Sequence, residues 1–447
     1  MRRWISLGMR HSALTTADAP GKPRHQTVRP VTMPPTDVSV TQAAARVTLL
    51  KMGRIKSFLT RTVDILLLPI VSLQRLFNRF EQNRPLNGIR KILVVEYWNI
   101  GDVILLLPFL RNLRLSFPCA QITLLVNPKV VALLVDQGVA DDLIEVRVPW
   151  AQHFARWRKY NPFSSLWVQL ARTLTVLRRQ HFDLALTGRM DIRDNLLIWL
   201  IGARERVGYS LGGGGRLLTE RVTPDPARPH RSQVWLRLLE HLGKPIVYTQ
   251  PRLSLSERER AFAGQFLASH GIGTEDIVLG IHSGARIPTR SWGLKNFAAV
   301  EAQLASEFSI KTIWFFEPGA PVALDLPSPR VVTATLTLRQ FMAVLERCHL
   351  LICNDGGPMH IATALGVPVV AVFGPTQPVW FGPIGELNRV VIRPEFWCRP
   401  CFDYCRFDQP YCLRIISCEE VLRAAREALR GLASSEREAE PQRAGAI

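Results

Sequence analysis

The chain has 447 residues, of which 47% are hydrophobic and 21% charged, and its formal net charge is +19. This length and balance are typical of a globular protein of two or three domains with a large buried core. Residues 1–91 hold sixteen Lys and Arg against four Asp and Glu. Most of the positive excess therefore precedes the folded body, which argues against a nucleic-acid-binding protein.

The N-terminal region divides into two segments. Residues 1–47 are basic and rich in Pro, Thr and Ala without periodicity, so we expect disorder, and they lack the apolar region of a secretory signal. Residues 48–87 are predicted to form a basic amphipathic helical segment, and their apolar run Ile65–Leu73 is too short to span a bilayer. Two interpretations stay open: a helix in the membrane interface, or a helix packed on the folded body.

A first strand–helix–strand unit is predicted between Lys91 and Pro128. A buried apolar strand leads through the turn Ile100-Gly101-Asp102 into a segment whose apolar residues recur at helical spacing, and a second strand follows. By its position alone, Asp102 is a typical N-cap residue for this helix.

Two alternating series of strands and helices make up the rest of the chain. Residues 88–250 are predicted to form one Rossmann-like domain and residues 251–432 a second, with a disordered tail over 433–447. The glycine run 212–215 lacks the strand–turn–helix setting of a dinucleotide site, so we interpret it as a mobile loop near the cleft. The predicted fold class is α/β, with two doubly wound domains.

The segment 354–376 indicates a ligand site. An apolar strand runs into a Gly-Gly-Pro turn, a small-residue helix and a second strand. The N-terminus of such a helix offers unpaired N–H groups, and glycines let an anion approach the backbone, so a diphosphate would fit there. A purely structural turn is the alternative. The candidate ligand-binding residues are Asp355, Gly356, Gly357, His360, Gly374, Pro375 and Thr376.

Five of the eight cysteines lie between residues 398 and 418. The spacing C-x2-C-x3-C-x6-C is compatible with zinc or an iron–sulfur cluster, and disulfides are not expected without a secretory signal. An ordinary structural role is the alternative. The candidate ligands of a structural metal are Cys398, Cys401, Cys405 and Cys412.

Three segments resemble signatures of glycosyltransferase family 9, the lipopolysaccharide heptosyltransferases. The segment from Asp355 resembles D-[ST]-G-x-x-H-x-A-x-A-x-G-x-P followed by F-G-P-T, with Gly356 in place of Ser or Thr. The turn at Gly101-Asp102 resembles the family's opening motif, with Glu96 where many members carry a basic residue. A softer segment resembles H-x-G-A…[KR]-x-W-P, with Arg290 in place of a phosphate-binding Lys. Its matching positions include His282, Gly284, Ala285, Trp292 and Phe297.

The resemblance implies a GT-B enzyme, with the donor on the C-terminal domain and the acceptor on the N-terminal domain. It implies inverting transfer of a sugar, heptose from ADP-heptose, to a lipopolysaccharide core or related glycan. Asp102 would be the catalytic base, with Asn99 and Gly101 on the acceptor side, and Arg290 would hold the diphosphate. No cofactor and no catalytic metal would be required, since the nucleotide-diphosphate sugar is itself a substrate.

The implied partners are a nucleotide sugar, a glycan or lipid-linked glycan acceptor and an anionic membrane surface, but no nucleic acid. The expected location is the cytoplasm, peripheral on the cytoplasmic face of the inner membrane. Because a fold alone does not fix a substrate, three other functions stay open: another GT-B glycosyltransferase, a sugar-nucleotide epimerase and a non-catalytic glycan-binding scaffold.

Overall fold

A computed structural model describes residues 88–151, 163–319, 331–402 and 405–443, together with Thr62, Pro69 and Asn161. For residues 432–443 only the backbone is described. The predicted disordered extension 1–47 and nearly all of the helical segment 48–87 therefore lie outside the described residues. Within the described ranges, no helix is both long enough and apolar enough to cross a membrane.

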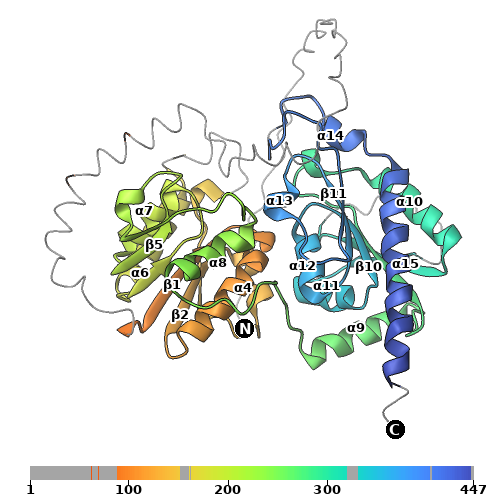
Figure 1. The fold of residues 1–447 in the computed structure, drawn as a ribbon, viewed down its shortest axis with the longest axis horizontal. Helices are drawn as coiled ribbons and strands as arrows, with labels where there is room; N and C mark the ends of the chain where they lie inside the picture. The colour runs from red at the N-terminus through yellow and green to blue at the C-terminus, as the bar shows by residue number, and fades with distance from the viewer. Residues whose placement is uncertain are drawn as a thin grey trace, which may run out of the picture. The chain divides into compact units, whose positions relative to one another are not determined.

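The first half of the described chain contains a six-stranded parallel sheet with strand order β3-β2-β1-β4-β5-β6 (Figure 1). Its strands are β1 (Lys91–Glu96), β2 (Gln121–Val126), β3 (Asp142–Glu145), β4 (Leu184–Leu186), β5 (Glu205–Tyr209) and β6 (Glu220–Val222). The helices that follow or connect them are α4 (Ile100–Ser116), α5 (Val131–Leu134), α6 (Ser165–Arg178), α7 (Ile192–Ile201) and α8 (Arg231–His241).

The second half contains another six-stranded parallel sheet, with strand order β12-β11-β10-β7-β8-β9. Its strands are β7 (Ile277–His282), β8 (Ile310–Phe316), β9 (Val331–Thr335), β10 (Leu350–Asn354), β11 (Val369–Phe373) and β12 (Arg389–Ile392). Its helices are α9 (Glu257–Ser269), α10 (Leu294–Glu307), α11 (Leu338–Glu346), α12 (Gly357–Leu365), α13 (Pro378–Phe381), α14 (Tyr411–Arg414) and α15 (Cys418–Arg443).

Both sheets have the same topology, which confirms the predicted fold class. Numbered within its own half, each sheet follows the order 3-2-1-4-5-6 of a doubly wound nucleotide-binding fold. The strand order reverses between β1 and β4 in the first sheet and between β7 and β10 in the second. In such sheets, ligands bind in the crevice outside the carboxyl ends of the strands at this reversal.

Alternate residues of each strand face different helix layers, because side chains of a strand point to opposite faces. On β1, Ile92 and Val94 pack with α4 and α8, whereas Leu93 and Val95 pack with α6 and α7. In the second sheet, α9, α11 and α12 cover one face, and α10 and α15 cover the other.

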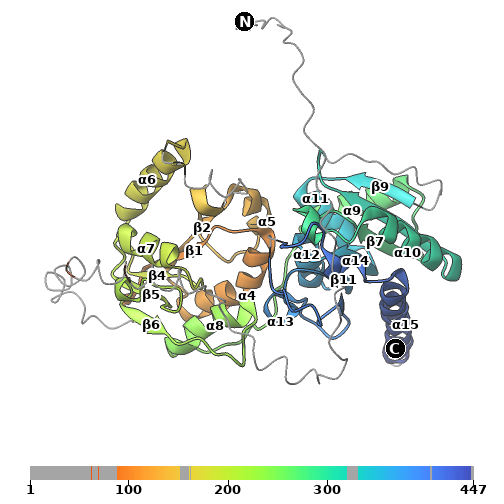
Figure 2. The same ribbon diagram turned by 90° about the horizontal axis from the view of Figure 1, so that it is seen from above.

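A single hydrophobic cluster extends through both halves. It contains the inner face of the first sheet, helices α4, α8, α9, α11 and α12, and the facing side of the second sheet. Helices α4 and α12 lie side by side in both views (Figures 1 and 2). The N-terminal ends of these two helices are therefore held close to one another.

Two expectations about loops and ends differ from the structure. The glycine run 212–215 is buried and does not line the cavity described below. A Cβ on Gly214 would lie 3.1 Å from the side chains of Ile192 and Asn195, so this part of the run packs against α7. At the other end, α15 continues to Arg443 instead of ending at the expected tail from 433. Residues 433–443 are rich in Glu, Arg and Ala, which are good helix formers.

Candidate active site

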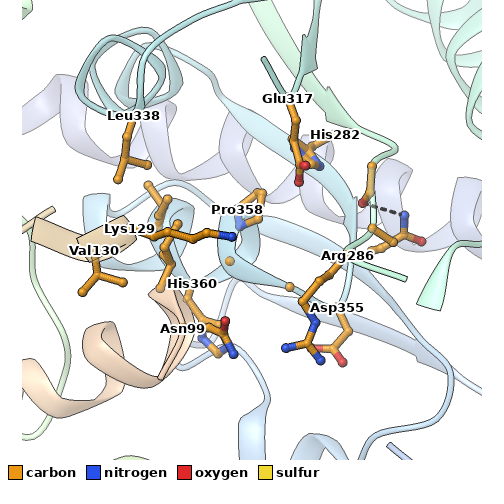
Figure 3. Close-up of a pocket in the computed structure, with 18 of the residues that line it drawn as sticks. Asn99, Lys129, Val130, His282, Arg286, Glu317, Leu338, Asp355, Pro358 and His360 are labelled. Atoms are coloured by element: carbon orange, nitrogen blue, oxygen red, sulfur yellow. Dashed lines mark hydrogen bonds between the residues drawn. The ribbon is translucent and has the colours of Figure 1, made fainter. Parts of the chain in front are cut away.

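A cavity of about 1070 Å³ lies at the carboxyl ends of both sheets. From the first half, its wall includes the loop 98–102 after β1 and Arg189 after β4. From the second half, it includes the loop after β7 and the turn 354–358 after β10. Both strand-order reversals therefore open on one space, and Figure 3 shows Asn99 and His360 close together in its wall.

The carboxylate of Asp102 lies at this wall in the first turn of α4. The N-cap of α4 is Asn99, and Asp102 is the third residue of the helix in a capping box. Its Oδ2 accepts a hydrogen bond from the backbone N–H of Asn99 at 3.2 Å. Asp102 is therefore not the N-cap that the sequence predicted, because it caps the helix from the third helical position, N3. Its side chain remains 15% exposed.

Two arginines set the charge state of Asp102. Arg189 Nη2 lies 2.5 Å from Asp102 Oδ1. Burial would raise the pKa of Asp102, but the charges of Arg189 and Arg231 and the hydrogen bond from Asn99 hold the pKa below its ordinary value. The carboxylate is therefore ionised and able to accept a proton at neutral pH.

A buried glutamate joins the same two arginines. Glu96 is the last residue of β1 and is 0% exposed. Its Oε1 lies 3.2 Å from Arg189 Nη2, and its Oε2 lies 2.9 Å from Arg231 Nη2. Arg189 lies three residues after the end of β4, and β4 pairs with β1 in parallel register, so the side chain of Arg189 reaches the end of β1. Two carboxylates and two guanidinium groups thus form one compact cluster.

His360 belongs to α12 but contacts α4. A Cβ on Gly101 would lie 2.5 Å from His360 Cδ2, so the ring packs directly on the backbone beside Asp102. Burial lowers the pKa of His360 to about 4, so the imidazole is neutral at physiological pH. Only glycine at position 101 allows this approach of the two helices.

The Gly-Gly turn at the start of α12 lies beside a second charged group. Asp355 is buried, and its Oδ2 accepts a hydrogen bond from Thr376 Oγ1 at 2.5 Å and lies 3.5 Å from Arg290 Nη1. Asp355 fixes Arg290 at the wall of the cavity, next to the free N–H groups at the N-terminus of α12. Gly356 and Gly357 line the cavity as well.

Asn354 positions the loop that carries Arg290. Its Oδ1 accepts a hydrogen bond from the backbone N–H of Trp292, and its Nδ2 donates to the carbonyl oxygen of Ser283. Trp292 in turn is buried and donates to the carbonyl oxygen of Ile416. The segment around Arg290, from Ser283 to Trp292, is therefore held at both ends by Asn354 at the end of β10.

The turn Gly374-Pro375-Thr376 is only partly in the site. Thr376 lines the cavity, but Gly374 and Pro375 do not. A Cβ on Gly374 would lie 2.6 Å from the side chain of Leu413, and the carbonyl oxygen of Pro375 accepts hydrogen bonds from the cysteine-rich segment. These two residues face that segment, so their predicted contact with a ligand has no support in this geometry.

The cysteine-rich segment braces this turn from outside. The backbone N–H groups of Cys401 and Phe402 donate to Pro375, and the buried Arg399 donates to the carbonyl oxygen of Thr376. Burial raises the pKa of the Cys412 thiol to about 11. Across the described residues, no three His, Cys, Asp or Glu side chains are grouped so as to hold a metal ion. The metal interpretation of Cys398, Cys401, Cys405 and Cys412 therefore gains no support.

Several residues at or behind the cavity wall were not predicted from the sequence as parts of the site. Arg189 follows a short strand of the predicted series and Glu96 ends another, and the strand-end position is the signal that could have found them. Arg231 carries no such signal, because its contact with Glu96 joins positions 135 residues apart. Lys129, after β2, lines the cavity, and its amine points toward Pro358 in Figure 3.

Comparisons with known proteins agree with this geometry. Residues 169–411, more than half of the chain, match the profile of glycosyltransferase family 9 (heptosyltransferase). Over 313 residues the chain is 22% identical to the lipopolysaccharide core heptosyltransferase OpsX of Haemophilus influenzae, covering 68% of this chain and 84% of that protein.

Solved structures show the same architecture. The glycosyl transferase family 9 protein of Veillonella parvula has a TM-score of 0.61 and 26% identity, covering 76% of this chain and 98% of its own. The E. coli ADP-heptose lps heptosyltransferase II has a TM-score of 0.58 and 19% identity, covering 77% and 99% of the two chains. Two doubly wound domains that share one cavity are the GT-B architecture of these glycosyltransferases.

The chain belongs to glycosyltransferase family 9 and is an enzyme of the heptosyltransferase type. The family that we predicted from the sequence is thereby confirmed.

Proposed function

We propose that this enzyme transfers heptose from ADP-heptose to a hydroxyl group of a lipopolysaccharide core or related glycan, with inversion at the anomeric carbon. One observation carries the proposal: the ionised carboxylate of Asp102 and the Gly356-Gly357 turn line the same cavity, each at the strand-order reversal of its own sheet. The names of the relatives in this family support heptose as the sugar.

In the proposed reaction, Asp102 acts on the acceptor. As the acceptor oxygen forms its bond to the anomeric carbon, its proton passes to the carboxylate of Asp102. The bond between the anomeric carbon and the diphosphate oxygen breaks at the same time, and ADP leaves with the bonding electron pair. A single displacement of this kind places the new bond on the face opposite the leaving group, which is why the configuration inverts.

The second half of the cavity would stabilise the leaving group. The α12 N-terminus presents backbone N–H groups and the positive end of its dipole, and Arg290 lies beside it. Arg286 and Lys129 also line this part of the cavity. These groups supply the positive charge that a departing diphosphate needs, so we propose that transfer requires no divalent metal. Chelation with EDTA should leave the transfer rate unchanged.

Water must be kept from the donor, because water in place of the acceptor would hydrolyse ADP-heptose. The neutral His360 ring and Ile100 fill the space between the two helix N-termini, where a Cβ on Gly357 would lie 3.4 Å from Ile100. We propose that this packing, together with closure of the domains on the substrates, limits access of water to the anomeric carbon.

The decisive experiment offers the enzyme several donors with one acceptor. Labelled ADP-heptose, UDP-glucose and GDP-mannose are each incubated with lipopolysaccharide from a heptose-deficient strain, and the linkage of the product is determined by NMR. We expect transfer from ADP-heptose alone and an inverted linkage. Transfer from another donor, or conversion of the donor itself without an acceptor, would show a different glycosyltransferase or an epimerase.

A further inference from the structure

Glu96 is a departure of this chain from its family that lies behind the cavity wall, in contact with Arg189. It is fully buried at the end of β1, six positions before Asp102, where many family members carry a basic residue. A buried carboxylate is costly unless positive charge and hydrogen bonds compensate it. Here Arg189 and Arg231, from other parts of the chain, compensate the charge of Glu96. The surrounding structure therefore accommodates an acidic residue at this position.

The two oxygens of Glu96 hold two different guanidinium groups. Oε2 accepts from Arg231 Nη2 at 2.9 Å, and Arg231 Nη1 also donates to the carbonyl oxygen of Gly188 at 2.6 Å. Arg231 thus ties Glu96 to the residue that precedes Arg189. Oε1 accepts from Arg189 Nη2 at 3.2 Å. The position of the Arg189 backbone and the position of its side chain are therefore both fixed through Glu96.

One nitrogen of Arg189, Nη2, contacts both Glu96 and Asp102. Arg189 Nη2 lies 2.5 Å from Asp102 Oδ1. The other face of this guanidinium stacks on Trp98, with its central carbon 4.7 Å from the ring centre. Arg189 is consequently confined by a ring and by two carboxylates, and this confinement sets where the Asp102 carboxylate lies at the cavity wall.

The other ionisable groups nearby do not share Arg189 with Asp102 as Glu96 does. Burial raises the pKa of Asp194 to about 7, and its carboxyl bonds to Tyr97. Asp191 pairs with Arg193, and His360 is neutral at physiological pH. Among the described residues, Glu96 is the carboxylate that shares Arg189 with Asp102.

We propose that Glu96 is a positioning residue, which acts through Arg189 to orient the Asp102 carboxylate toward the acceptor and to prevent it from forming an exclusive ion pair. This inference rests on the proposed role of Asp102 as the base. A carboxylate in an exclusive pair with arginine is a weaker proton acceptor than one that shares the arginine with a second carboxylate. Glu96 would therefore affect the rate of transfer and leave donor binding unchanged.

The test begins with Glu96→Gln, which keeps the size of the side chain and removes its charge. We expect kcat to fall about 10- to 100-fold, as for a catalytic group misplaced by a distant change, with the KM for the donor and the Kd for ADP unchanged. Glu96→Asp keeps the charge and should recover part of the rate. Glu301→Gln is the matched control, because Glu301 is also buried but belongs to α10 of the second half and accepts a hydrogen bond only from Thr312 among the described contacts.

A double-mutant cycle with Asp102→Asn separates this inference from the proposed function. If Glu96 acts through Asp102, Glu96→Gln should slow the residual single-turnover rate of the Asp102→Asn enzyme less than threefold. An equal loss in both backgrounds would show that Glu96 has a general structural role and would overturn the inference. Near-normal turnover of Asp102→Asn alone would instead overturn the role of the base, and the inference with it.

A charge-balanced variant keeps the test valid if Glu96→Gln fails to fold. Glu96→Gln combined with Arg231→Gln removes one negative and one positive charge from the cluster, so no unpaired buried charge remains. The same loss of kcat with normal ADP binding is expected from this pair. Full activity of the folded double variant would contradict the positioning role.

Discussion

Asp102 performs two tasks with one carboxylate. One oxygen accepts the hydrogen bond that completes the N-terminal capping box of α4, and the other lies against Arg189 at the cavity wall. The capping contact and the ion pair with Arg189 together fix the side-chain rotamer, and the arginine also keeps the group ionised. A helix-capping position thus supplies an ionised carboxylate, the base of the proposed reaction, whose direction is set before any substrate arrives.

Replacing Asp102 by Asn should separate chemistry from folding. Asn can still accept the bond from the Asn99 N–H, but it cannot take a proton, so transfer should fall by about 10²- to 10⁴-fold. Loss of the charged contact with Arg189 should lower the free energy of unfolding by about 1–2 kcal/mol. Initial rates and urea denaturation of the two proteins measure both effects.

The pH dependence of this stability difference gives a control. The pKa of Asp102 is lower in the folded protein than in the unfolded chain, where it is about 3.9. The stabilisation of the folded state by the Asp102 charge is therefore fully present above about pH 3.9 and is lost as the pH falls through the folded-state pKa. The difference between the wild type and Asp102→Asn should therefore be constant from pH 5 to 7 and shrink at lower pH. A difference that grows on acidification would contradict the assigned charge state.

Arg290 should act on phosphate and not on the nucleoside. Its guanidinium lies beside the α12 N-terminus and is held by Asp355. Arg290→Ala should weaken ADP binding about tenfold or more, the usual effect of losing a hydrogen bond to a charged group, and should leave adenosine binding unchanged. Calorimetry with both ligands measures this, with Arg258→Ala on the exposed face of α9 as the control. Equal losses for ADP and adenosine would show that Arg290 does not contact the phosphates.

At the scale of elements, the contact between α4 and α12 depends on a residue without a side chain. Gly101→Ala should improve helix propensity, but its Cβ would overlap the His360 ring. We expect a net loss of stability, because the N-terminal ends of α4 and α12 must separate. The rate of transfer should fall at least tenfold, because Asp102 would then lie farther from the Gly356-Gly357 turn. Thermal melting and initial rates measure the two losses.

Two controls accompany this prediction. Gly264→Ala in α9 meets nothing within 4 Å and should raise the free energy of unfolding by about 0.5–1 kcal/mol. His360→Ala removes the overlap, so Gly101→Ala should cost much less stability in the His360→Ala background than in the wild type. The same loss of melting temperature in both backgrounds would rule out this contact as the cause.

The elements around the site were predictable because their signals are local. The strand, glycine turn and helix after residue 350 and the turn at Gly101-Asp102 appear in the structure close to their expected bounds. Arg231 and the partners of Glu96 could not be predicted, since they depend on which strands are neighbours in the sheet. The ligand contact of Gly374 and Pro375 stays a prediction, and no sequence pattern shows that the cysteine-rich segment returns to cover that turn.

At the scale of the whole molecule, the role of residues 48–80 stays a prediction, since nearly all of them lie outside the described residues. We propose that they attach the enzyme to an anionic membrane surface, where a lipid-linked acceptor would be found. Each Lys or Arg near such a surface contributes about 1 kcal/mol, and the apolar face adds a part that salt does not remove. Deleting residues 1–80 should abolish flotation with anionic vesicles and spare activity on soluble acceptor fragments.

The alternative for this segment gives the opposite result. A helix packed on the folded body would, when deleted, lower the melting temperature and leave vesicle binding unchanged. Flotation at low and high salt and thermal melting of both proteins therefore distinguish the two roles. A shortened chain that floats as well as the full chain would exclude the membrane role.

The hydrophobic cluster that runs through both sheets has a consequence for cooperativity. Because α4, α8, α9, α11 and α12 share one apolar interior, neither half can lose its structure without exposing the core of the other. Calorimetry should show a single transition whose measured enthalpy equals the van't Hoff enthalpy. A donor analogue at about 100 times its Kd should stabilise the native state by about 2.7 kcal/mol. The bound analogue should slow amide exchange in β1 and β2 as much as in β10 and β11. Binding to one domain would then reduce local opening in the other domain as well.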